Sequence, residues 1–366
     1  MVAVLAATGA VAIGYVVLKA LVGIYGWTHS HHELPQLSSK VALATPSSPA
    51  NAVDVLRPFF TTKHDFALFV RKWLPHPDKT PRGIVFLVHG IGEHGGRYDH
   101  IARILARAGF AVFAVDHQGH GLSDGERMFA QKLVHLAEDY LEFVDHVVNG
   151  PSKGSVNASV IDPTLDPHAD VQWNKLPKFV FGHSMGGVVT LQIAELSHAR
   201  GVKWDGVVLS APAIYCSPLG KHPWFISLVT KLSTWMPKNT LPPIGFEVLG
   251  NDPNVATRWL RDPLRPAHGS TIRLVAQLIT EGRRFAQEET EFTSKHFSAP
   301  LYLLHGEHDA VCFVNGSLRF YNKCATKDKT LNVVPTPLHE TLNIEGYDEI
   351  VKEIIVWMEK HVVEVS

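Results

Sequence analysis

A serine lies at the centre of the pentapeptide Gly182-His183-Ser184-Met185-Gly186, which has the spacing Gly-x-Ser-x-Gly. The apolar run 179–181 before it predicts a buried strand, and the residues from Val188 onward predict a helix. A serine on such a sharp turn adopts a strained backbone conformation, and the flanking glycines remove Cβ atoms that would clash. The pattern predicts a nucleophile elbow with Ser184 at its apex.

An acid and a base follow two later strands in the order that such a serine requires. Residues 301–304 predict a strand that leads to Asp309, and residues 331–334 predict one that leads to His339. His339 would take the proton of Ser184, and Asp309 would orient the imidazole. Glu307 lies nearer its strand end and is the poorer candidate for the acid. The order serine, acid, histidine is that of the α/β-hydrolase fold.

The oxyanion hole is expected from two backbone N–H groups. The predicted strand 83–88 runs directly into His89-Gly90-Ile91-Gly92, a glycine-rich loop. In an α/β hydrolase that loop gives one donor, here Ile91, and the residue after the nucleophile, Met185, gives the second. Together with the triad these donors predict acyl transfer through a covalent intermediate.

The rest of the chain alternates predicted strands and helices after an opening hairpin at 59–62 and 66–73. Continuous apolar strands with helices between them predict an α/β fold, with a mostly parallel sheet of about eight strands covered on both faces. A polar stretch at 149–177 predicts a surface loop. An insertion at 213–292 carries two amphipathic helical stripes and is expected to form a cap above Ser184. The stripes either pack only on each other or also line an acyl tunnel and touch lipid.

Composition excludes several other functions. The chain has 366 residues, of which 34 are basic and 35 acidic, so a general nucleic-acid footprint is not expected. Three scattered cysteines predict no disulfide framework, and Cys312 is interpreted as a buried structural thiol. Among 22 histidines we find no metal motif. His117 and His120 suit a tight loop at a strand exit, His183 is interpreted as shaping the elbow, and we predict neither a metal nor a cofactor.

The first residues form a separate segment. Residues 1–27 are apolar, carry no charged side chain before Lys19 and close with Tyr25 and Trp27, so they predict a membrane anchor helix. The alternative is an apolar helix packed on the domain, and a cleaved signal peptide fits less well because a basic start is missing. Residues 28–57 are a predicted linker, and 58–366 the hydrolase domain. We expect attachment to the endoplasmic reticulum or another endomembrane, with the side of the membrane and the oligomeric state left open.

Three long motifs occur in an order that resembles the monoacylglycerol lipase family, which includes lysophospholipase-like and plant caffeoylshikimate esterase-like members. They are His89-Gly90-Ile91-Gly92-Glu93-His94-Gly95-Gly96-Arg97-Tyr98, Asp116-His117-Gln118-Gly119-His120-Gly121-Leu122-Ser123 and Gly182-His183-Ser184-Met185-Gly186-Gly187. The resemblance runs from about residue 59 to the end. It implies a serine hydrolase that cleaves the ester of a single-chain lipid, with the roles above on Ser184, Asp309, His339, Ile91 and Met185.

The resemblance also places Glu93 and Arg97 near the position of a glycerol headgroup, although the two could equally form an ion pair that braces the loop. The chain departs from the animal enzymes at Leu342, where those have a second histidine. The substrate therefore stays open between a monoacylglycerol, a lysophospholipid and a phenolic ester, and so does acyl transfer to another alcohol. An inactive, membrane-tethered binding protein is the remaining alternative.

Overall fold

The computed structural model describes residues 59–151, 157, 159–161, 166–216, 222–242, 257, 259–286 and 291–362. The predicted anchor 1–27 and linker 28–57 lie outside these ranges. Within the described ranges we find no helix that combines the length and the apolar character needed to cross a bilayer.

The described chain forms one eight-stranded sheet with the order β1-β2-β4-β3-β5-β6-β7-β8. Strands β1 and β2 form an antiparallel hairpin, β2 pairs antiparallel with β4, and the remaining neighbours are parallel. The predicted, mostly parallel α/β sheet is thus confirmed. The strands are β1 (Phe59–Thr61), β2 (Ala67–Trp73), β3 (Gly83–Val88), β4 (Phe110–Val115), β5 (Lys178–His183), β6 (Gly206–Ser210), β7 (Leu301–Gly306) and β8 (Lys329–Val334).

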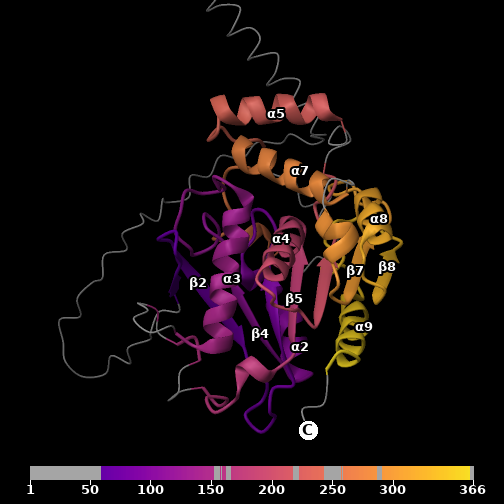
Figure 1. Cartoon of the computed structure of the whole chain (residues 1–366). Helices are drawn as coiled ribbons and strands as arrows, with labels where there is room; N and C mark the ends of the chain where they lie inside the picture. Colours follow the sequence, from indigo (N-terminus) through magenta and orange to yellow (C-terminus); the bar gives the residue numbers. More distant parts are fainter. Residues whose placement is uncertain are drawn as a thin grey trace, which may run out of the picture.

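Helices cover both faces of this sheet, which explains why its central strands are apolar throughout (Figure 1). On β3, Ile84 and Phe86 face the core beneath α3, α4 and α8, while Val85 and Leu87 face the core beneath α2 and α9. The helices are α2 (Asp99–Arg107), α3 (Leu133–Asn149), α4 (Met185–Ala199), α8 (Val314–Lys323) and α9 (Tyr347–Glu359).

The insertion between β6 and β7 lies above the sheet, where α5 (Pro223–Trp235) crosses over α7 (Ile272–Ala286) (Figure 1). Phe225 and Val229 of α5 pack on Ile272, Ala276 and Ile279 of α7. The two predicted apolar stripes therefore pack on each other only in part, because Leu278 joins the main core and Trp235 is 76% exposed. The opposite face of α7 joins the main core, so this helix connects the insertion to the sheet.

Two segments differ from the sequence predictions. Helix α4 begins at Met185 rather than Val188, directly after the serine. The stretch 149–177 is not wholly a surface loop, because Ile161 and Trp173 are buried in the main core. Asn157 of this stretch also exchanges two hydrogen bonds with the backbone of Thr61, which ties it to the edge strand β1.

Candidate active site

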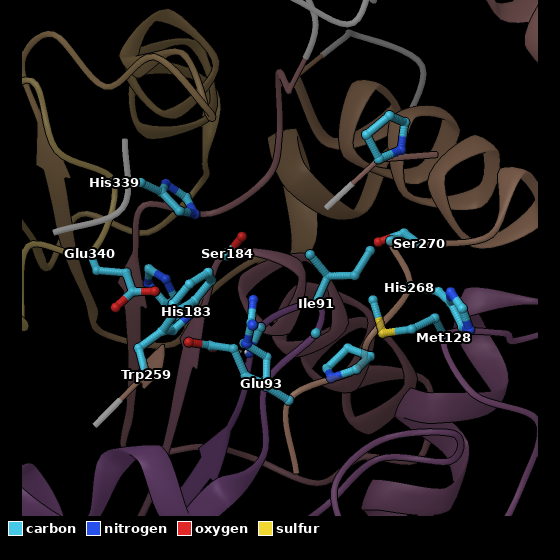
Figure 2. A pocket seen from close by; sticks show the side chains of 16 residues that line it. Ile91, Glu93, Met128, His183, Ser184, Trp259, His268, Ser270, His339 and Glu340 are labelled. Carbon is cyan, nitrogen blue, oxygen red and sulfur yellow. Dashed lines mark hydrogen bonds between the residues drawn. The ribbon is translucent and has the colours of Figure 1, made fainter. Parts of the chain in front are cut away.

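The parallel strands end together, and their carboxyl ends carry all the predicted site residues. Val88 of β3 pairs with Gly182 of β5, and Leu304 of β7 pairs with Asn332 of β8. Loops that follow aligned strand ends meet at one edge of a sheet. Ser184 and His339 consequently line one cavity together with Ile91, although they are far apart in the sequence (Figure 2).

Ser184 occupies the strained turn that the sequence predicts. Its φ is +53°, a left-handed conformation that side chains rarely adopt. The turn is held on two sides, because the Ser184 N–H donates to the carbonyl of Ser210 at 3.0 Å and its carbonyl accepts from Ala213 at 3.0 Å. A Cβ at Gly186 would come within 2.1 Å of the Val88 carbonyl, so the start of α4 rests directly on the end of β3.

Asp309 and His339 form a buried pair. The Nδ1 of His339 lies 2.7 Å from Asp309 Oδ2, while Oδ1 accepts from the backbone N–H groups of Val311 and Cys312. Burial opposes ionisation of Asp309, but His339 and His305 outweigh it and hold its pKa well below the usual range. Burial likewise opposes a charged His339, yet Asp309 raises the pKa of the imidazole above its ordinary value. The pair can therefore accept and hold a proton.

No hydrogen bond joins the side chains of Ser184 and His339, both of which the structure describes. Burial raises the pKa of Cys312 well above its ordinary value, and the Ser184 hydrogen bond opposes that shift. Cys312 is thus a buried neighbour of the serine. Catalytic hydrogen bonds are often made only when substrate is bound. The hydrogen bond between Ser184 and His339 therefore stays a prediction.

The loop after β3 is fixed by side chains rather than by secondary structure. His89 Nε2 accepts from the backbone N–H of His117 at 2.8 Å, so Nδ1 carries the proton and donates to the carbonyl of Gly90 at 2.8 Å. The N–H of Gly90 donates to Glu93 Oε2 at 2.8 Å. With both polar groups of Gly90 occupied, the next residue, Ile91, is held at the wall of the cavity.

Glu93 belongs to a buried charge network with Arg97 and Glu340. Arg97 Nε donates to Glu93 Oε1 at 3.0 Å, and Nη2 donates to both oxygens of Glu340 at 3.1 and 2.9 Å. Tyr98 adds a hydrogen bond to Glu93 at 2.6 Å. Burial opposes ionisation of Glu93, but Arg97, His183 and Tyr98 together hold its pKa at about 2. Of the two interpretations of Glu93 and Arg97, the geometry favours the ion pair that braces the loop.

Glu340 was not anticipated from the sequence. It directly follows His339, which was the only available signal, and it lines the cavity beside Glu93 (Figure 2). Burial raises the pKa of Glu340, and Arg97 only partly offsets the shift. Leu342, at the position of the expected second histidine, is buried in the core beneath α2 and α9 and is not among the residues that line the cavity.

The insertion closes over the site through the segment between its two helices. His94 Nε2 lies 2.7 Å from Asp262 Oδ2, which ties the loop after β3 to the insertion. In the described part of the insertion, the cavity is lined by Pro242, Trp259, Arg265, Pro266, His268, Gly269 and Ser270. Neither α5 nor α7 lines this cavity. The cavity holds about 80 Å³.

The other histidines near the site are buried and pack against the loops around it. His183 Nδ1 lies 3.2 Å from Ser210 Oγ, its ring packs on His339 at 4.8 Å, and burial lowers its pKa to about 4. His117 and His120 pack around His89, and burial lowers the pKa of both. Both ring nitrogens of His89 already have hydrogen-bond partners, so His89, His117 and His120 do not form a metal-binding set.

Comparison with known proteins identifies the class. A family model described as "Serine aminopeptidase, S33" matches residues 79–159 and 162–345. The chain is 30% identical to a monoacylglycerol lipase of Mycolicibacterium smegmatis over 78% of this chain and 91% of that protein. It is 29% identical to the human monoglyceride lipase over 80% of this chain and 86% of that protein.

Two solved structures share the fold. The monoacylglycerol lipase of Paleococcus ferrophilus covers 80% of this chain and 99% of its own, with 29% identity and a TM-score of 0.61. A soluble variant of the yeast monoglyceride lipase covers 81% of this chain and 92% of its own, with 21% identity and a TM-score of 0.67. The sheet, the elbow and these matches define an α/β-hydrolase that acts on carboxylic esters. The chain belongs to the monoglyceride lipase-type family of serine hydrolases.

The charge network around Arg97 generates a prediction about stability. Glu93→Gln should lower the free energy of unfolding at pH 7 by about 3 kcal/mol, because the pKa of Glu93 falls from 4.5 to about 2 on folding. A depressed pKa gives stability that is present above pH 4.5 and lost as the pH falls toward 2. The difference from the wild type should therefore shrink over that window in urea denaturation of the full chain.

The matched control is Glu349→Gln, which removes an exposed partner of Lys352 and should leave the urea midpoint unchanged. A Glu93→Gln protein as stable as the wild type at pH 7 would contradict the structural role given to this carboxylate.

Proposed function

We propose that Ser184 is the nucleophile, that His339 is the general base and acid, and that Asp309 orients and stabilises the imidazole. The observation that carries this proposal is the 2.7 Å contact between His339 and Asp309 beside a serine with a φ of +53°. The N–H groups of Ile91 and Met185 form the oxyanion hole in this proposal. Support for Ile91 comes from its place in the cavity wall, and for Met185 from its place as the first residue of α4.

The reaction begins when the Ser184 hydroxyl turns to donate to His339 Nε2. As Oγ attacks the ester carbonyl, its proton passes to His339 Nε2 and the carbonyl oxygen becomes an oxyanion that Ile91 and Met185 stabilise. The tetrahedral intermediate collapses, the alcohol leaves with the proton from His339, and an acyl-enzyme remains. Water then repeats the sequence, with His339 as the base, and releases the fatty acid.

We propose a monoacylglycerol as the substrate. The relatives named above act, by their names, on monoacylglycerols, and the cavity offers the carboxylate of Glu340, which can accept hydrogen bonds from headgroup hydroxyls. Arg97 is already paired with Glu93 and Glu340, so it is not available to an anionic headgroup. The cavity of about 80 Å³ suits a small polar group, and an acyl chain requires displacement of the covering segment 259–270.

A lysophospholipid is the second candidate, and one observation favours it. Arg265 lines the same cavity, where its guanidinium stacks on Trp259 at 4.1 Å. A cation at that wall could bind a phosphate diester.

The nucleophile is tested by Ser184→Ala. The variant should lose labelling by a fluorophosphonate and should hydrolyse a soluble ester about 10⁴ to 10⁶ times more slowly, because no acyl-enzyme can form. The control is Ser197→Ala on the same helix, whose hydroxyl bonds Trp204 instead of facing the cavity. It should keep both activities. Labelling that survives in Ser184→Ala would exclude the assignment, and a folded wild type without ester turnover would revive the inactive binding protein.

The headgroup is tested by turnover of monooleoylglycerol, lysophosphatidylcholine and a caffeoyl ester. We expect the monoacylglycerol to be preferred, and Glu340→Gln to reduce that preference about tenfold by weakening a hydrogen bond of about 1.4 kcal/mol to the headgroup. Because Glu340 also pairs with Arg97 next to His339, both proteins are compared on a short p-nitrophenyl ester, which has no polyol, and the loss on monooleoylglycerol should exceed the loss on this ester about tenfold. Faster turnover of lysophosphatidylcholine that falls in Arg265→Gln would favour the second candidate, and an equal loss on every ester would contradict the headgroup role of Glu340.

We also propose that residues 1–27 anchor the protein to an endomembrane. The support is their apolar composition, with no charged side chain before Lys19 and with Tyr25 and Trp27 at the end. The full chain should pellet with membranes and resist alkaline extraction, whereas a variant without residues 1–27 should be released with ester hydrolysis intact. Full-length protein that stays in the supernatant would contradict the proposal.

A further inference from the structure

The turn between β1 and β2 fixes a histidine against the first turns of α3. The hydroxyl oxygen of Thr62 accepts from the backbone N–H groups of His64 at 3.2 Å and Phe66 at 3.4 Å. Asp65 completes the turn with a φ of +63°. The position of the His64 side chain is therefore set by a built turn and not by a free loop.

Three side chains with metal-ligating atoms meet there. His135 and Glu138 are three positions apart on α3 and so share one face of the helix, toward which His64 points. The ligating atoms of His64, His135 and Glu138 all lie within 4.8 Å of one another, and His64 Nε2 is 3.4 Å from Glu138 Oε2. Two imidazoles and one carboxylate are a known ligand set for zinc. None of the three lines the cavity around Ser184.

A second carboxylate orients the His64 ring. Asp139 is 1% exposed, and its Oδ1 lies 2.6 Å from His64 Nδ1. A carboxylate on one imidazole nitrogen fixes the proton there and directs the lone pair of the other nitrogen outward, as in carboxylate–histidine–zinc arrangements. With Nδ1 as the donor, the lone pair of Nε2 faces the negative oxygen of Glu138. That arrangement calls for a positive charge between the two atoms.

The charge next to Glu138 in this structure is a lysine. Lys63 Nζ lies 3.1 Å from Glu138 Oε2, but its side chain is 47% exposed and can swing into solvent. Lys63 therefore competes with a cation for one ligand, whereas His64 and His135 are suited to hold one.

We propose that His64, His135 and Glu138 bind a divalent transition metal, with Zn²⁺ as the first choice, and that solvent completes the coordination. Imidazole with carboxylate selects such ions over Mg²⁺ or Ca²⁺, which prefer oxygen ligands throughout. The ion would join the β1–β2 hairpin to α3, and its role would be structural because the cavity is lined by other residues.

The test is calorimetric titration of Zn²⁺ into the metal-free, untagged full chain in detergent. His29, His31 and His32 are replaced by alanine in every protein compared, because these amino-terminal histidines could bind zinc themselves. We expect one Zn²⁺ per chain and a higher melting temperature when it is bound. His64→Gln and His135→Gln should each abolish binding. Asp139→Asn should weaken it by about 10 to 100-fold through the orientation of His64.

Lys63→Gln should change the Zn²⁺ affinity in the opposite direction from the histidine variants. Removing the competing ammonium should tighten Zn²⁺ binding, whereas a purely structural ion-pair cluster would only be weakened. The matched control is His76→Gln, an exposed histidine with Asp78 as its ion-pair partner at 3.1 Å, and it should leave the titration unchanged. Hydrolysis of a soluble ester verifies that each variant is folded. Absent Zn²⁺ uptake by the wild type, or uptake that persists in both His64→Gln and His135→Gln, would overturn the proposal.

Discussion

The site depends on one strained residue, Ser184, which is held between two strands and a helix. Its φ of +53° is unfavourable by about 1 to 3 kcal/mol, and the surrounding packing maintains it. That packing requires a glycine at position 186, because a side chain there would clash with the carbonyl groups of Val88 and His89. The same contact fixes the end of β3 and hence the loop that carries Ile91. Ser184 and the loop that carries Ile91 are thus positioned by a single close approach of backbone to backbone.

Buried charges hold the loops that the backbone leaves free. Arg97 joins a carboxylate from the loop after β3 with one from the loop after β8, and Glu93 in turn holds Gly90. Burial alone would neutralise Glu93, so its low pKa reflects how completely Arg97, His183 and Tyr98 compensate the charge. Since Glu340 directly follows His339, the network also fixes the segment that carries His339.

The insertion contacts the rest of the domain at two places, one apolar and one polar. Helix α7 shares the apolar core, whereas the segment between the helices is tied through the polar contact of His94 with Asp262. Breaking such a polar contact costs less free energy than opening an apolar core, because water can replace the lost hydrogen bond. Displacement of segment 259–270, which covers the small cavity, is therefore easier than displacement of α7.

The sequence by itself determined the sheet, the elbow and the placement of Asp309 and His339 after their strands. Local patterns suffice there, because continuous apolar runs predict buried strands and aligned parallel strands end at one edge. Only the tertiary structure decided that Glu340 meets Arg97, that His94 meets Asp262 and that His64 meets His135. Each of these contacts joins polar residues from distant loops, where no periodicity specifies a partner. The place of Ser184 beside the buried thiol of Cys312 is likewise set by the packing of distant segments, which the order of the residues does not specify.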